Sequence, residues 1–222
     1  MSVWAVLAAA GRGERLDADR PKAFAPLRGR PLLAESLERL ESSRWIDSIV
    51  VVAPPGWEEP VILLAEELGC GKVIASVAGG EKRGESVRLG VEEVGNDAAV
   101  ILVHDAARPL VSDVVIERVV TPLSQGWDGA VPGLPLVDTV KRVRDSAVEE
   151  TLPRGELMAV QTPQAFVAGV LRDAVAGDVA SASDCASLVE ARGGRVLVVD
   201  GDPRLLKVTT AEDLALVESW LA

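Results

Sequence analysis

The sequence predicts an α/β fold, with a mostly parallel sheet between two layers of helices. Short aliphatic runs alternate with amphipathic segments along most of the 222 residues, which is the pattern of βαβ units. Hydrophobic residues make up 48% of the chain and aromatic residues only 3%. Strands rich in Val, Leu and Ala suit a sheet that is buried on both faces. The expected three-layer fold is Rossmann-like.

Six apolar runs are expected to form strands. They span residues 3–9, 49–53, 73–77, 98–103, 196–199 and 206–208. The first run faintly resembles a signal peptide, but no basic segment precedes it and a glycine-rich loop follows at once, so we interpret it as the first strand. No apolar stretch approaches the roughly 20 residues that a membrane-spanning helix needs. We therefore expect no membrane partner and a cytoplasmic protein.

Helices are expected between these strands. They begin near residue 31 and span residues 57–68, 86–94, 112–123, 183–192 and 210–221. Ser112 and Ser183 are the expected N-cap residues of two of them. Thr210 and Asp213 have the spacing of a capping box at the start of the last helix.

The chain is expected to form a single domain over residues 1–222, with an arm at about residues 133–160. Between Pro132 and Pro163 the alternation of strand and helix breaks down. Residues 136–144 alternate in the manner of a strand but carry charges, and no long helix follows them. This pattern indicates an arm or hairpin that leaves the main sheet.

The charge balance and the cysteine count exclude some classes of function. A net charge of −11 argues against a protein that grips nucleic acid through a broad basic surface. A small polyanionic ligand is still compatible, because a few Arg and Lys in one loop can neutralise it locally. Cys70 and Cys185 lie far apart without CxxC spacing, so we expect two reduced thiols and neither a disulfide nor a zinc site.

A glycine-rich loop follows the first strand. Gly11 and Gly13 would let the backbone come close to a ligand, with its N–H groups facing phosphate oxygens. Arg15 and Lys22 would add positive charge near the same anion. A dinucleotide-binding loop would need a third glycine where Leu16 stands, and the P-loop pattern is absent. Taken alone, the loop could equally be a plain connection.

Asp105 follows the most hydrophobic strand. Ligands of open α/β sheets gather at the carboxyl ends of the strands, so a carboxylate there is well placed to hold Mg²⁺. The alternative is that Asp105 only caps the turn into Arg108. His104 is the only histidine, and its position at the end of an apolar strand favours a structural role over an acid–base one.

Lys207 lies between apolar residues just before the last helix. An anion opposite it would offset the cost of burying its charge in part. The alternative is a lysine at a strand end whose amine reaches the solvent.

Together these motifs resemble the methylerythritol phosphate cytidylyltransferase family of the non-mevalonate isoprenoid pathway. The resemblance covers nearly the whole chain and is carried by residues 8–15 with 21–22, 79–87, 104–109, 138–141, 162–164 and 207–209. Many sugar nucleotidyltransferases share the glycine loop. The HDAARP, DTVK and TPQ stretches in this order are far more specific.

The resemblance implies two groups of substrate-binding residues. The nucleotide would be held by Ala9, Ala10, Gly11, Gly13, Gly80, Glu81, Ser86 and Ala106. The acceptor phosphate would be held by Arg108, Thr139, Arg154 and Lys207, with Thr162 nearby.

The resemblance also implies the catalytic groups and the metal. Arg15 and Lys22 would stabilise the charge on the α-phosphate and on the departing pyrophosphate, and Arg154 and Lys207 would act on the acceptor. Asp105 would bind Mg²⁺ near the ribose. Family members often carry a second acidic residue shortly before the lysine of KVT, and Asp202 is the nearest substitute here. Ala23 replaces a common glutamine.

In the family the arm exchanges with a second subunit, which implies a homodimer. The implied reaction transfers CMP from CTP to 2-C-methyl-D-erythritol 4-phosphate and releases pyrophosphate, by in-line attack of the acceptor phosphate on the α-phosphate. A cytidylyltransferase for another alcohol phosphate, such as ribitol 5-phosphate, is an alternative that Ala107 disfavours. A silent nucleotide-binding protein is a second alternative, but it would not need Lys22 and Lys207 together.

Overall fold

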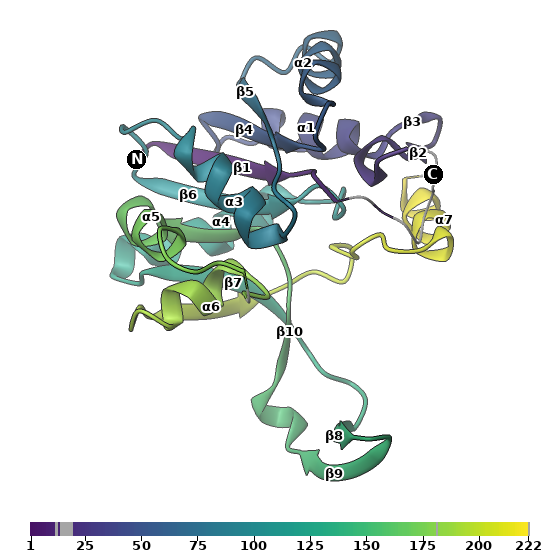
Figure 1. Cartoon of the computed structure of the whole chain (residues 1–222), viewed down its shortest axis with the longest axis vertical. Coiled ribbons are helices and arrows are strands. Elements are labelled where there is room, and N and C mark those ends of the chain that lie inside the picture. The colour runs from purple at the N-terminus through teal and green to yellow at the C-terminus, as the bar shows by residue number, and fades with distance from the viewer. Residues whose placement is uncertain (12, 14–19, 181, 222) are drawn as a thin grey trace.

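The computed structural model describes residues 1–11, 13, 20–180 and 182–221. Eight strands of this part form one sheet in the order β10-β7-β11-β6-β1-β4-β5, and β12 pairs with β7. They are β1 (Val3–Ala8), β4 (Ser48–Ala53), β5 (Val73–Ala78), β6 (Val100–Asp105), β7 (Gly129–Pro135), β10 (Met158–Val160), β11 (Gln164–Val167) and β12 (Val196–Asp200). Figure 1 shows the strands crossing the molecule side by side.

The sheet is parallel in one half and mixed in the other. Strand β1 pairs in parallel with β4 and β6, and β4 pairs in parallel with β5. Strand β11 is antiparallel to both β6 and β7, and β10 is antiparallel to β7. The predicted α/β fold with a mostly parallel sheet is confirmed. The antiparallel strands β10 and β11 lie at the end of the segment where the alternation breaks down and directly after it.

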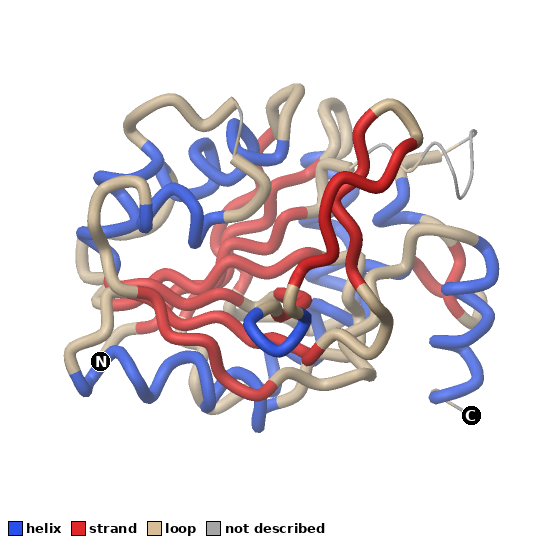
Figure 2. Tube along the Cα trace, turned by 90° about the horizontal axis from the view of Figure 1, so that it is seen from below, coloured by secondary structure: helices blue, strands red, loops and turns tan. Residues whose placement is uncertain are grey.

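Helices cover both faces of the sheet (Figure 2). One face packs against α1 (Leu32–Ser42), α2 (Glu58–Glu67) and α4 (Asp113–Val120). The other packs against α3 (Arg83–Glu92), α5 (Ala168–Val175) and α6 (Cys185–Glu190). The last helix, α7 (Ala211–Trp220), packs with the short pair β2 (Pro26–Leu27) and β3 (Arg30–Pro31). Short 3₁₀-helices span Lys22–Phe24, Thr121–Gln125 and Arg154–Glu156.

Helical spacing of apolar residues accounts for the packing of α1. Leu33, Leu37 and Leu40 lie on one face and are fully buried, as their spacing predicts. On the opposite side of the sheet, a Cβ on Gly90 would come within 2.6 Å of Val6 and of Val52. A glycine therefore lets α3 lie close to β1 and β4.

Two local predictions need correction. Ser112 is the N-cap residue of α4, as predicted, although its side chain makes no capping hydrogen bond. The N-cap residue of α6 is Asp184 and not Ser183, because the Asp184 carboxylate accepts a hydrogen bond from Ser187 N–H at 3.0 Å. Residues 206–208 are not a strand, since they lie outside the sheet and pack beneath α7. The predicted capping box of Thr210 and Asp213 is present.

The arm leaves the sheet after β7 and returns through β10. Its tip is the hairpin of β8 (Val140–Arg144) and β9 (Ala147–Leu152), which extends well beyond the body in Figure 1. Val143 and Val148 are paired across this hairpin and are 56% and 61% exposed. The two valines thus form a small exposed apolar pair near the tip of the arm.

Both cysteines are buried and free, as expected. Among the described residues, no helix combines the length and the apolar character needed to cross a bilayer.

Candidate active site

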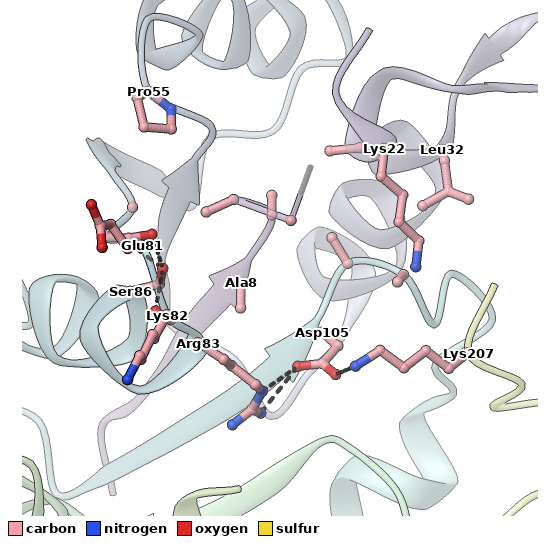
Figure 3. Close-up of a pocket in the computed structure, with 18 residues that line it drawn as sticks. Ala8, Lys22, Leu32, Pro55, Glu81, Lys82, Arg83, Ser86, Asp105 and Lys207 are labelled. Atoms are coloured by element: carbon pink, nitrogen blue, oxygen red, sulfur yellow. Dashed lines mark hydrogen bonds and ion pairs between the residues drawn. The ribbon is translucent and has the colours of Figure 1, made fainter. Parts of the chain in front are cut away.

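A cavity of about 420 Å³ opens at the carboxyl edge of the parallel strands (Figure 3). The register places Ala8 beside Asp105 and Ala53 beside Ala78, so the segments after β1, β4, β5 and β6 all begin at this edge. The cavity is lined by Ala8–Gly11, Lys22, Ala23, Leu32, Pro55, Gly79–Arg83, Ser86, Asp105–Ala107 and Lys207. The sheet therefore brings together motifs that lie up to roughly 200 residues apart in the sequence.

Two small-residue segments form one wall of the cavity. A Cβ on Gly79 would lie only 2.2 Å from the Cβ of Ala10, so a glycine is needed where the two segments touch. Gly80 N–H donates to Ser86 Oγ at 3.1 Å, and that hydroxyl also donates to Lys82 O at 3.1 Å. All of the predicted nucleotide-binding residues except Gly13 line this cavity.

Gly13 supports the site from outside the lining. It has a φ of +72°, and a Cβ there would meet the Cβ of Lys22 at 2.4 Å. The glycine therefore permits a close approach of the loop to the 3₁₀-helix that carries Lys22. Lys22 extends its amine toward the side of the cavity on which Asp105 and Lys207 lie (Figure 3). Arg15 lies outside the described residues.

Asp105 is the centre of a cluster of charges. Arg83 donates to its Oδ1 from Nε at 3.1 Å and from Nη2 at 3.0 Å, and Lys207 donates to Oδ2 at 2.7 Å. Burial by itself would raise the pKa of Asp105, but the charges of Arg83 and Lys207 outweigh it and hold the pKa well below its usual range. The Asp105 side chain is therefore ionised and does more than cap a turn.

The same contacts explain the position of Lys207. The anion that was expected opposite Lys207 is the carboxylate of Asp105. The side chain of Lys207 is 42% exposed, and that of Asp105 is 9% exposed. The amine thus reaches the cavity while it neutralises a buried carboxylate. With one anion and two cations, the cluster of Arg83, Asp105 and Lys207 has a net positive charge, which favours an anionic ligand.

His104 lies behind Asp105 and is fully buried. Its Nε2 is 3.0 Å from Arg108 O, and its Nδ1 is 3.1 Å from Thr162 Oγ1. Burial is the main cause that lowers the pKa of His104 to about 4. A neutral imidazole that donates to the carbonyl and accepts from the hydroxyl satisfies all these groups. This arrangement agrees with the structural role expected for the only histidine.

We predict that His104 makes the stability of the fold depend on pH. Its folded pKa of about 4 lies below the value of about 6.5 in an unfolded chain, so only the unfolded state gains a proton as the pH falls through that window. The free energy of unfolding should therefore decrease by about 3 kcal/mol between about pH 6.5 and about pH 4. Urea unfolding over this range, for the native chain and His104→Gln, measures this contribution. A difference between the two proteins that does not change with pH would contradict it.

Three other predicted residues do not line the cavity. Thr162 is buried and accepts a hydrogen bond from Asp105 N–H at 3.0 Å, so it supports Asp105 from behind. Arg108 Nη1 donates to Leu205 O at 2.5 Å, while its Nε is buried without a hydrogen-bond partner in the described part of the chain. Asp202 accepts a hydrogen bond from Arg204 N–H at 2.8 Å.

Thr139 and Arg154 lie in the arm and are exposed. Arg154 donates from Nη1 to Val137 O within the arm. Neither residue lines the cavity of its own chain.

Arg83 lines the cavity and pairs with Asp105. It belongs to a motif that carried the resemblance, but it was not among the predicted site residues. An arginine that follows a Gly-Gly turn at the start of a helix is a signal that could have identified it, because such a turn lies at the edge of the sheet where Asp105 also ends its strand. Lys82 is a second cation that lines the cavity and was missed.

The described side chains of the cavity can supply a single carboxylate ligand to a metal ion, and not a complete metal site. Among the described residues there is no group of three or more His, Cys, Asp or Glu side chains that could hold a metal ion. Mg²⁺ commonly takes one or two carboxylates and completes its shell with phosphate oxygens and water. Asp105 fits the role of a single carboxylate ligand to an ion that arrives with a triphosphate, whereas Asp202 does not line the cavity.

A mostly parallel sheet with a glycine-lined, cation-bearing cavity at its carboxyl edge is the kind of site that a nucleotidyltransferase needs. The sequence profile of the 2-C-methyl-D-erythritol 4-phosphate cytidylyltransferase family matches residues 3–222. The chain belongs to this family.

Individual relatives agree with this assignment. The chain is 44% identical over 228 residues to the 2-C-methyl-D-erythritol 4-phosphate cytidylyltransferase of Saccharopolyspora erythraea, with 100% of both chains covered. It is also similar to the crystal structure of the Thermus thermophilus enzyme of the same name, at 33% identity and a TM-score of 0.77, covering 100% of this chain and 98% of the other. The structure of 4-diphosphocytidyl-2C-methyl-D-erythritol synthase from Anaerococcus prevotii matches at 25% identity and a TM-score of 0.85, covering 99% and 98%.

Proposed function

We propose that this chain transfers CMP from CTP to 2-C-methyl-D-erythritol 4-phosphate and releases pyrophosphate. Its family membership supports the reaction. The structural observation that carries the proposal is that Lys22, Asp105 and Lys207 line a single cavity together with the small residues expected to hold the nucleotide.

The main chemical task is to bring two polyanions together. The acceptor phosphate is already an anion near neutral pH, so its attack on the α-phosphorus needs no strong general base, and the buried neutral His104 is not required as one. The protein contributes position and positive charge. Lys22, with Arg15, neutralises the charge that passes to the pyrophosphate. Lys207 holds the acceptor phosphate, with Arg154 from the partner described below.

A divalent cation, which we take to be Mg²⁺, is part of this proposal. When bound, it would neutralise charge on the triphosphate, and Asp105 is the protein group that would hold it. Arg83 keeps that carboxylate ionised. Lys207 must then exchange its contact with Asp105 for one with the acceptor.

We further propose a homodimer in which the arm of each subunit completes the cavity of the other. Thr139 and Arg154 are exposed on the arm and would reach the partner's acceptor site. The exposed Val143 and Val148 would lie in the contact between subunits. The cytoplasmic location stays a prediction.

Charges at the tip of the arm should separate this dimer. In a variant that combines Val143→Glu with Val148→Glu, two buried carboxylates would have to lose their hydration, so we expect dimer affinity to fall at least about 10-fold. Activity should fall in parallel, because each cavity loses the partner's Arg154. Sedimentation velocity over a range of concentrations and a pyrophosphate-release assay measure the two effects.

The matched control is Val114→Glu, because Val114 is a comparably exposed valine on α4, at 55%. It should leave both the dimer and the activity unchanged. A native chain that sediments as a fully active monomer would refute the arm proposal.

The function itself is tested by pyrophosphate release with CTP against a panel of alcohol phosphates. Turnover should be highest with 2-C-methyl-D-erythritol 4-phosphate. Preference for ribitol 5-phosphate would support the alternative acceptor. Binding of CTP in a calorimeter, without turnover on any acceptor, would support a silent nucleotide-binding protein.

A further inference from the structure

Arg83 is held in a fixed position at the start of α3. Two of its nitrogens, Nε and Nη2, donate to one oxygen of Asp105 at 3.1 and 3.0 Å. The third, Nη1, lies 3.7 Å from Cys185 Sγ. The Arg83 side chain is only 25% exposed. Each nitrogen of the guanidinium therefore has a partner within the protein.

The contact behind Arg83 is itself fixed. Cys185 is buried at the start of α6, and its N–H donates to Gln164 Oε1 at 3.2 Å. Gln164 also donates to the Asp184 carboxylate at 2.9 Å and belongs to β11, next to β6. The guanidinium is thus supported by α6 and β11 on one side and meets Asp105 on the other.

This arrangement leaves the two oxygens of Asp105 in different environments. Oδ1 accepts both hydrogen bonds from Arg83, while Oδ2 meets Lys207 at 2.7 Å. Figure 3 shows Arg83 and Lys207 approaching the carboxylate from opposite sides. Two donors on one oxygen resist rotation of the carboxylate, so Oδ2 stays on the side of Lys207 even when that lysine moves away.

We propose that Arg83 is a positioning residue for the transfer reaction, which acts through Asp105 by holding Oδ2 toward the substrates. This inference rests on the role of Asp105 in the proposed function. A direct contact of Arg83 with the triphosphate is the competing role, since Arg83 also lines the cavity. The positioning role is favoured because three of the five N–H groups of the guanidinium already have partners within the protein and the side chain is only 25% exposed.

A double-mutant cycle separates the two roles. Arg83→Gln should lower kcat/KM by about 10- to 100-fold, the usual effect of removing a group that orients a ligating side chain. If Arg83 acts through Asp105, the double variant Arg83→Gln with Asp105→Asn should be within about threefold of Asp105→Asn alone. Arg83→Gln should also change kcat and the KM values for the two substrates in the same proportions as Asp105→Asn. Multiplicative losses in the double variant would overturn the inference and support direct contact.

Two further variants exclude a general structural effect. Arg83→Lys keeps the charge but offers no planar fork, so it should recover part of the loss and stay at least about fivefold below the native chain. Full recovery by lysine would show that charge alone matters and would also overturn the inference. Arg88→Gln, on the same helix and outside the cavity, is the matched control and should keep native activity.

Thermal unfolding and calorimetric CTP binding test whether each variant is folded. If Arg83→Gln does not fold, the cycle is carried out with Arg83→Lys, and the same comparison with Asp105→Asn decides. Native activity of Asp105→Asn would contradict the role of Asp105 in the proposed function. If Asp105→Asn loses much of its activity and Arg83→Gln lowers kcat/KM further by its own full factor in the double variant, only the positioning role of Arg83 is contradicted.

Discussion

Lys22→Ala should lower kcat by about 10²- to 10³-fold, the loss expected when one donor to a developing negative charge is removed. Lys22 lines the cavity on the side of Asp105 and Lys207. Negative charge grows on the pyrophosphate as it departs, so the amine interacts more strongly with the transition state than with bound CTP. For that reason kcat and kcat/KM should fall together, while the KM for CTP changes little.

Lys72→Ala is the matched control for this experiment. Lys72 donates to Ser43 O at 2.7 Å, far from the cavity lining, and its removal should leave turnover unchanged. Steady-state and single-turnover rates with CTP measure the effect. A fall of less than about threefold in Lys22→Ala would exclude Lys22 from the chemical step.

The parallel half of the fold could be predicted from the sequence because each of its strands is a continuous apolar run. Strands β1, β4, β5 and β6 coincide with predicted runs within three residues at each end. The register of a parallel sheet then brings their carboxyl ends to one edge. This explains why Asp105 and the glycine loop, far apart in the sequence, could be expected at one site.

The mixed half was harder to predict. Strand β7 contains two glycines and two prolines, residue types that are depleted in strands, and β11 is only four residues long. Both segments are strands because they pair side by side between β6 and β12. Such pairing is decided by tertiary contacts and not by the local sequence pattern. Residues 206–208 show the opposite error: their apolar side chains pack beneath α7, but no strand of the described chain pairs with them.

Within the site, the sequence predicted which side chains lie there better than it predicted the contacts between them. The small residues and Lys207 were found through motifs and line the cavity. The pairing of Asp105 with Arg83 and Lys207 was not predicted, because it depends on how α3 meets the end of β6. The proposed acceptor role of Arg154 requires a partner subunit, because the fold of one chain does not bring that residue to the cavity.

Asp105→Asn should affect both stability and activity. The substitution removes the cost of burying a carboxylate but leaves Arg83 and Lys207 facing a neutral amide. In the native fold the pKa of Asp105 is lowered despite its burial, so the attraction of the two cations outweighs that cost. The asparagine variant should therefore be less stable at neutral pH, by about 2 kcal/mol, the usual contribution of hydrogen bonds to a charged group.

The sign of the pH dependence tests this cause of the stability difference. A carboxyl group whose pKa is lowered by folding stabilises the protein above its unfolded pKa of about 3.9, and that stabilisation is lost as the pH falls below it. The stability difference between the native chain and Asp105→Asn should stay constant from about pH 8 to about pH 5 and shrink only below about pH 4. Asp200→Asn, at an exposed position at the end of β12, should show no such difference.

The activity of Asp105→Asn should fall by at least about 10²-fold, and a higher Mg²⁺ concentration should be needed for half-maximal rate, because a neutral amide is a poorer ligand for a hard cation than a carboxylate. The loss of activity and the loss of stability have different origins and can be separated. Activity measured well below the unfolding temperature of the variant reports the site alone, since the population of unfolded protein is then negligible. A variant that loses about 2 kcal/mol of stability but keeps its native rate and Mg²⁺ requirement would mean that Asp105 only balances the charges of Arg83 and Lys207, and the metal would have to be held by the nucleotide alone.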